Sequence, residues 1–194
     1  FGASFEGRKS CSFGDAAATS FFPAKPLGCY GDGGAIFTND ANMANVYRSI
    51  RVHGQGNDKY DNIRIGLNSR LDTLQAGILL NKLEIFDNEL ILRNNIAEYY
   101  SKELKKYLIT PFIKKGNISS WAQYSLLCKD YNERESLIEY LKNNGVPTAI
   151  YYEKLFSDLK IYKNLPSFDF SVSEKTSNCI FSIPMHPYLE KTDM

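Results

Sequence analysis

The chain lacks a charge surplus and long apolar runs, and these two absences exclude some classes of function before any motif is considered. Its 23 Lys and Arg residues are balanced by 22 Asp and Glu residues, which gives a formal net charge of +1. A nucleic-acid-binding protein typically shows a strong or clustered basic surplus, so nucleic acid is not an expected partner. No apolar run approaches the roughly 18–20 residues that span a bilayer, so we expect no membrane-spanning helix.

Cysteine is scarce and scattered. The four cysteines are Cys11, Cys29, Cys128 and Cys179; no pair has metal-type spacing, and none lies near another in the sequence. We therefore expect no metal site and interpret them as free thiols of a reducing compartment. The chain starts without the charged and apolar pattern of a signal peptide, and the expected localisation is cytoplasmic.

What is present is a hydrophobic core and an alternation of strands and helices. Hydrophobic residues make up 43% of 194 residues, which suits one ordinary domain or one and a half small ones. Strands are predicted over residues 18–22, 34–38, 121–128, 147–152 and 178–184. Helices are predicted over 41–50 and 132–144, and one or two helices over 72–107. This alternation predicts an α/β fold. Residues 53–68 are predicted to form a long functional loop.

The helix predicted over residues 72–107 carries apolar residues at i, i+3 and i+4 spacing. These residues are Leu71, Leu74, Ile78, Leu79, Leu83, Phe86, Leu90 and Ile91. A helix of this length can connect two domains.

Residues 20–35, with the sequence SFFPAKPLGCYGDGGA, hold one lysine in a tight loop between two apolar runs. Two prolines, several aromatic residues and four glycines surround this residue, Lys25. A lysine that forms a Schiff base must be held rigidly, partly desolvated and aimed at a cofactor aldehyde. From residue types alone, a surface lysine in an ordinary Gly/Pro-containing loop is the commoner interpretation.

The order of residues in this segment resembles the active-site segment of the DegT/StrS family of nucleotide-sugar aminotransferases, which use pyridoxal 5'-phosphate (PLP). Further segments match that family in order: RVHG at 51–54, GLNSRLDTLQA at 66–76 and SIPMHP at 182–187. The resemblance implies an α/β fold of the PLP-dependent transferase (aspartate aminotransferase type I) class. It implies that residues 1–95 are the C-terminal part of the PLP-binding large domain. Residues 96–194 would be the small C-terminal domain, incomplete at its end, and the chain a fragment lacking the N-terminal part.

The resemblance also implies roles for individual residues. Lys25 would form the Schiff base with PLP and act as general base and acid, while Ser20 and Asn68 would contact the PLP phosphate. Asn68 would do so from the neighbouring subunit of a homodimer with a shared active site. Arg70 lies near the same interface, where its guanidinium could bind a carboxylate in bidentate fashion. A structural contact of Arg70 with Asp72 or with backbone is the alternative.

Tyr151, Tyr152 and His186 are expected near the sugar substrate. The family often has His-Tyr-Pro where residues 151–153 read Tyr-Tyr-Glu, so Tyr151 replaces a histidine and cannot carry its positive charge. This substitution leaves the exact sugar open.

Residues 21–30, 70–76 and 121–125 favour the subgroup that acts on UDP-2-acetamido-2-deoxy-3-oxo-glucuronate. The implied reaction moves an amino group from glutamate to this UDP-sugar, for surface polysaccharide (O-antigen, lipopolysaccharide) biosynthesis. Two alternatives are an aminotransferase for another 3- or 4-keto nucleotide sugar, and a non-catalytic sugar-nucleotide-binding or subunit-interaction fragment.

Overall fold

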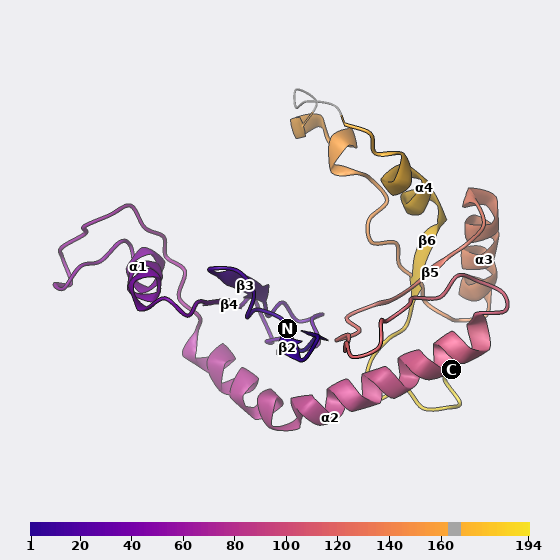
Figure 1. Ribbon diagram of the computed structural model, residues 1–194, viewed down its shortest axis with the longest axis horizontal. Helices are drawn as coiled ribbons and strands as arrows, with labels where there is room; N and C mark the ends of the chain where they lie inside the picture. Colours follow the sequence, from indigo (N-terminus) through magenta and orange to yellow (C-terminus); the bar gives the residue numbers. More distant parts are fainter. Residues whose placement is uncertain (163–167) are drawn as a thin grey trace. The chain divides into compact units, whose positions relative to one another are not determined.

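The computed structural model describes residues 1–162 and 168–194, and Figure 1 labels its helices and strands. The chain divides into two compact units. Unit 1 comprises Phe1–Ile91 and Lys114–Ser120, and unit 2 comprises Leu92–Ile113 and Trp121–Met194. Helix α2 (Thr73–Leu104) begins in unit 1 and ends in unit 2. The predicted boundary at residues 95/96 also lies inside α2, and as a domain boundary of the complete protein it stays a prediction.

The strands of unit 1 form two antiparallel pairs. Strand β1 (Ser4–Phe5) pairs with β2 (Arg8–Lys9), and β3 (Ala17–Ser20) pairs with β4 (Gly34–Phe37). In the second pair, Ser20 lies opposite Gly34. The predicted strand over 18–22 therefore ends two residues early, because the chain turns out of the sheet after Ser20. The Lys25 segment is the connection between β3 and β4.

Helix α1 (Ala41–Arg51) confirms the helix predicted over residues 41–50. Its first turn is capped by Asp40, whose Oδ1 accepts hydrogen bonds from the N–H groups of Asn42 (2.7 Å) and Met43 (3.1 Å). A side-chain acceptor at this position satisfies backbone donors that have no partner inside the helix. This cap is local in sequence, and so the helix start was predictable.

Helix α2 buries only part of the apolar set that the sequence shows on it. Leu79 and Phe86 lie in the core of unit 1, but Leu74 is 74% exposed and Leu83 is 43% exposed. The residues at the same helical spacing as Leu79 and Phe86 are Gln75 and Lys82. Their polar ends bond to a neighbouring loop, so apolar periodicity alone could not identify the buried face.

Unit 2 is built around one antiparallel strand pair, β5 (Tyr124–Leu127) with β6 (Ile180–Ile183). Helix α3 (Tyr131–Asn143) follows β5, two 3₁₀ turns lie at Phe156–Asp158 and Lys160–Tyr162, and helix α4 (Ser171–Cys179) precedes β6. The core contains fully buried side chains of both strands, Tyr124, Leu126 and Phe181.

Two predictions for unit 2 were wrong in detail, and one helix was not predicted. Residues 147–152 form no strand; only Ala149 pairs with β6, by reciprocal backbone hydrogen bonds to Ser182 (3.1 and 2.7 Å). The strand predicted from residue 121 begins at Tyr124, because Trp121 has a φ of 46° and a left-handed residue cannot continue a strand. Helix α4 was missed because its sequence, SVSEKTSNC, contains only two apolar residues, Val172 and Cys179.

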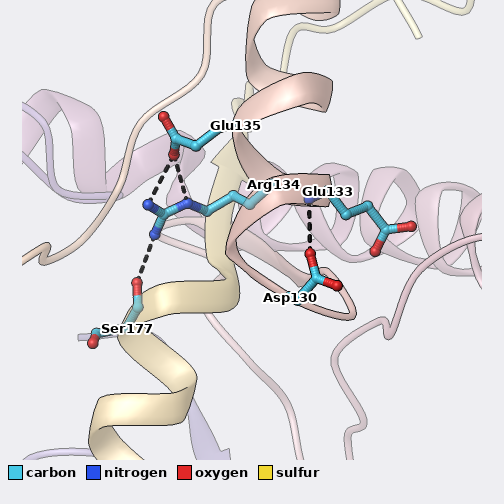
Figure 2. Close-up of polar contacts among 5 residues, drawn as sticks. All are labelled: Asp130, Glu133, Arg134, Glu135 and Ser177. Atoms are coloured by element: carbon cyan, nitrogen blue, oxygen red, sulfur yellow. Dashed lines mark hydrogen bonds and ion pairs between the residues drawn. The ribbon is translucent and has the colours of Figure 1, made fainter.

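Arg134 of α3 makes a buried polar contact with α4, which Figure 2 shows. Its side chain is only 5% exposed, and Nη1 donates to the carbonyl of Ser177 in the last turn of α4 (2.6 Å). Nε and Nη2 both reach Oε1 of Glu135, at 2.9 and 2.8 Å. A cation at a helix C-terminus satisfies a carbonyl that has no partner inside the helix. Arg134 therefore joins α3 to α4.

Among the described residues, none of the helices combines the length and the apolar character that crossing a bilayer requires.

Candidate active site

The Lys25 loop begins with a tight turn directly after β3. The Lys25 N–H donates to the carbonyl of Phe22 (2.8 Å), which closes a four-residue turn with Pro23 in its second position. Proline favours this position because its ring fixes φ near the value that the turn needs. Two more backbone bonds close the loop on Phe21, whose N–H donates to Gly33 and whose carbonyl accepts from Cys29, both at 2.7 Å.

The return half of the loop is buried beneath this turn. Leu27 is 3% exposed and Cys29 is fully buried. A Cβ atom on Gly28 would lie 2.7–2.8 Å from the carbonyl oxygens of Pro23 and Phe22, which is too close for any other residue. Glycine is therefore required where the return segment passes under the turn. The turn that ends at Lys25 therefore rests on the buried residues of the return half of the loop.

The Lys25 side chain itself is exposed, which differs from the partly desolvated amine that we expected. The reason is its position: all four residues of the turn, Phe22–Lys25, are exposed, while the buried residues lie in the return half. The loop thus presents an accessible amine from a fixed backbone.

Ser20 is the last residue of β3 and lies five positions before Lys25. Its Oγ accepts a hydrogen bond from the N–H of Phe22 (3.1 Å). A hydroxyl that accepts in this way keeps its own hydrogen to donate. The exposed Ser20 side chain is therefore chemically suited to a phosphate oxygen, at the edge of the Lys25 turn.

Asn68 and Arg70 lie on a segment whose backbone is hydrogen-bonded to the C-terminal end of α1. Leu67 N–H donates to Ile50 (2.7 Å), and Ser69 N–H donates to Arg51 (3.0 Å). The Nε of Arg70 donates to Oδ1 of Asn68 (3.1 Å). Because a guanidinium group only donates, this bond turns the amide oxygen of Asn68 toward Arg70 and leaves the NH2 group to donate to an anion.

The alternative interpretation of Arg70 was a structural contact with Asp72 or backbone. In the described part of the chain, the hydrogen bond that the structure gives Arg70 is the one to Asn68. Arg70 is exposed and also lines a cavity of about 1100 Å³ in unit 1. The described residues around this cavity do not include Ser20, Lys25 or Asn68.

Between α1 and Asn68, residues 53–68 form the predicted long loop. Its two arms are joined by a bridge between Gln55 and Asn62 and by a hydrogen bond from Ile63 N–H to Gly54 (3.0 Å). His53 and Gly54 adopt left-handed φ values of 58° and 75°, which turn the chain sharply at the end of α1. The loop is therefore ordered by its own backbone contacts.

The other predicted site residues lie in unit 2. Tyr151 and Tyr152 are 45% and 77% exposed, and their rings meet edge to face at 5.9 Å between centroids. His186 is exposed, and its Nδ1 accepts from the N–H of Tyr188 (3.3 Å). The bridge between Ala149 and β6 aligns the tyrosine segment with the strand that leads to His186.

Two buried residues of α2 that the sequence analysis missed hold the His186 segment. Arg93 Nη1 donates to the carbonyl of Met185 (3.2 Å) and to that of Trp121 (2.9 Å). The hydroxyl of Tyr100 donates to the carbonyl of Pro184 (3.1 Å). Burial, followed by the negative charge of Asp193, raises the pKa of Tyr100, so this hydroxyl stays protonated as a donor. Met185 lies 92 residues from Arg93 and Pro184 lies 84 residues from Tyr100, so no local pattern indicated these contacts.

Two further residues of α2, Gln75 and Lys82, contact the return half of the Lys25 loop. Gln75 Oε1 accepts from the N–H of Tyr30 (2.8 Å), and Lys82 Nζ donates to the carbonyl of Gly28 (2.6 Å). The Lys82 ammonium also lies 4.5 Å from the centre of the Tyr30 ring. The sequence feature that could have identified them is their spacing, because Gln75 and Lys82 lie on the same face of the helix as the buried Leu79 and Phe86.

The sequence and structure were compared with those of known proteins. A model of the DegT/DnrJ/EryC1/StrS aminotransferase family matches residues 1–194. The chain belongs to this family. The UDP-2-acetamido-2-deoxy-3-oxo-D-glucuronate aminotransferase of Pseudomonas aeruginosa is 50% identical over 197 residues, which cover 98% of this chain and 52% of the relative. The dTDP-3-amino-3,6-dideoxy-alpha-D-galactopyranose transaminase of Aneurinibacillus thermoaerophilus is 36% identical over 194 residues, covering 100% and 52%.

Solved structures of this aminotransferase family have the same fold. A DegT/DnrJ/EryC1/StrS aminotransferase from Brucella abortus superposes with a TM-score of 0.95 at 46% identity, covering 99% of this chain and 51% of that one. DesV of S. venezuelae, in complex with a ketimine intermediate, gives 0.92 at 29% identity, covering 99% and 52%. The predicted family and the α/β, PLP-dependent transferase type I fold class are confirmed. The chain spans about half the length of the relatives it matches.

Proposed function

We propose that the complete protein is a PLP-dependent aminotransferase that moves an amino group from glutamate to a keto-sugar nucleotide. The observation that carries this proposal is the Lys25 loop, in which an accessible amine stands on a turn with a buried base. An enzyme amine that must attack a cofactor aldehyde needs this combination of access and fixed position. The similarity to transaminases of nucleotide sugars supports the same assignment.

The residues present are chemically suited to PLP. Lys25 would hold the cofactor covalently, and the Ser20 hydroxyl and the Asn68 amide would donate to its phosphate. When bound, PLP supplies the electron sink that stabilises carbanionic charge. The Lys25 amine, once released, would take a proton from the donor amino acid and return it, as general base and then general acid.

For the sugar, the proposal names UDP-2-acetamido-2-deoxy-3-oxo-glucuronate. Support comes from the name of the 50% identical relative and from Arg70, whose planar guanidinium matches a carboxylate. Tyr151, Tyr152 and His186 would contact the sugar. Tyr151 offers a hydroxyl where the family has histidine, so the carboxylate would depend more strongly on Arg70.

The proposal extends to the assembly and its setting. The active site would be shared in a homodimer, with Asn68 acting on the cofactor of the partner subunit. The enzyme would work in the cytoplasm, in the biosynthesis of surface polysaccharide such as the O-antigen of lipopolysaccharide.

The test is covalent trapping of the cofactor. The complete protein is incubated with PLP and reduced with borohydride, and the modified lysine is located by peptide mass spectrometry. We expect the label on Lys25. Lys25→Ala should lose the label and transaminase activity, whereas Lys102→Ala, an exposed lysine near the end of α2, should keep both. Labelling of another lysine in an active Lys25→Ala protein would refute the assignment.

A further inference from the structure

We propose that Gln75 and Lys82 of α2 are positioning residues that fix the Lys25 loop and thereby orient the Lys25 amine. This inference rests on the proposed function, because it assigns both residues to the presentation of the lysine that would hold PLP. Among the described residues, the hydrogen bonds and the ring contact that the structure gives these two side chains are with loop backbone and with the Tyr30 ring.

The placement of these residues on α2 is the first argument. Gln75, Leu79, Lys82 and Phe86 follow one another at spacings of four, three and four, so they form one stripe along the helix. Leu79 and Phe86 are 6% and 4% exposed and pack in the core of unit 1. A lysine on a core-facing stripe is unfavourable unless its charge finds partners. The partners of Lys82 are both in the Lys25 loop.

The contacts of Lys82 use its charge. Its Nζ donates to the Gly28 carbonyl at 2.6 Å, and the same ammonium lies 4.5 Å from the Tyr30 ring centre. A cation strengthens the hydrogen bond and is attracted to the face of the ring, so a neutral side chain cannot replace it. Gln75 adds a second attachment through the Tyr30 N–H. The loop is thus held at Gly28 and at Tyr30.

Gly28 connects the contact with Lys82 to the turn that ends at Lys25. It packs directly beneath the carbonyls of Phe22 and Pro23, and the Phe22 carbonyl accepts the Lys25 N–H. A displacement of Gly28 would therefore change the turn that ends at Lys25. Small displacements of a reacting group reduce rate strongly while changing binding little.

The first measurement needs no cofactor. Amide hydrogen exchange of residues 22–31 is followed in the complete, PLP-free protein, for the wild type, Lys82→Met, Lys82→Arg and Gln75→Leu. We expect exchange at Tyr30 and Lys25 to become about tenfold faster in Lys82→Met and Gln75→Leu. Lys82→Arg keeps the charge and should restore most of the protection. Lys102→Met, a matched change at an exposed position of the same helix, should have no effect.

The second measurement uses the PLP-loaded enzyme. We expect Lys82→Met to lower kcat about tenfold and to leave KM for glutamate within about twofold, with Lys82→Arg recovering most of the rate. The fraction of PLP that borohydride attaches to Lys25 should fall in parallel. Gln75→Leu provides the same test if Lys82→Met does not fold.

The two proposals fail in different ways. If the wild type attaches no PLP to Lys25, the proposed function is wrong, whatever the exchange data show. If the wild type is labelled and active, but Lys82→Met and Gln75→Leu leave exchange of residues 22–31 unchanged, the positioning role is refuted. Equal loss in Lys82→Met and Lys82→Arg would also refute it, because the charge would then be irrelevant.

Discussion

Replacing Arg134 by alanine should destabilise unit 2 by about 2–4 kcal/mol. The largest contribution is the hydrogen bond from the buried guanidinium to the Ser177 carbonyl at 2.6 Å. Hydrogen bonds to charged groups contribute about 1.5–3 kcal/mol, and the partly buried Ser177 carbonyl adds a smaller cost when it loses this partner. The guanidinium also lies 4.9 Å from the centre of the Tyr131 ring, which adds about 0.5–1 kcal/mol for a half-exposed ring.

The ion pair with Glu135 should contribute little to this total. The Glu135 side chain is 46% exposed, although its Oε1 lies only 2.8 Å from Nη2 of Arg134. Water screens an exposed partner, and such pairs contribute about 0–1 kcal/mol. Glu135→Gln is therefore the matched control, with an expected loss below about 1 kcal/mol.

Trp121 makes the measurement specific. It is the chain's single tryptophan, 8% exposed, and it belongs to the core of unit 2. Urea unfolding of the complete protein, with any tryptophan outside residues 1–194 replaced by phenylalanine and Trp121 fluorescence as the signal, therefore reports on the unit that contains Arg134. If Arg134→Ala costs less than about 1 kcal/mol, or if Glu135→Gln costs as much as Arg134→Ala, the contact with α4 is not the main source of the stabilisation by Arg134.

Three other predictions concern the site and the buried thiols. Arg70→Ala should reduce kcat/KM for the 3-keto-glucuronate roughly ten- to hundredfold, and reduce it much less for the matching neutral keto-hexose, because a charge-assisted contact would be lost. Equal losses for the two sugars would make Arg70 structural. Mixing inactive Lys25→Ala subunits with inactive Asn68→Ala subunits should restore one working site per heterodimer; no recovery after proven subunit exchange would argue against a shared site. Burial raises the pKa of the Cys128 thiol to about 11, so Cys128 should resist iodoacetamide at pH 8 in the folded protein.

The Cys128 pKa also has a consequence for stability at high pH. Because the folded-state pKa is raised, the thiol contributes its stabilisation fully below its usual value of 9.0 and loses it as the pH rises toward about 11. Cys128→Ser, which does not ionise in this range, should flatten that part of the profile. Rapid alkylation of Cys128 in the native protein would show that the thiol is accessible and ionised.

Local features of this protein were determined by the sequence alone. The Asp40 cap and α1, the Pro23 turn that ends at Lys25, and the glycine beneath that turn depend on backbone preferences within a few residues. The family was also readable, because its segments keep their residue types and order. For these features, the interactions that determine the structure lie within one short stretch of chain.

Features that depend on distant partners were decided only by the tertiary structure. Gln75 reaches Tyr30 across 45 positions, and Lys82 reaches Gly28 across 54. In the sequence, these polar residues of α2 cannot be distinguished from solvent-exposed ones, because the loop that bonds to them is distant in the chain.

The same reason explains the segment at residues 147–152. Its β-branched and aromatic content suits a strand, but only Ala149 finds backbone partners on β6. A strand needs a row of paired neighbours, and whether that row exists is a property of the folded chain and not of the segment itself.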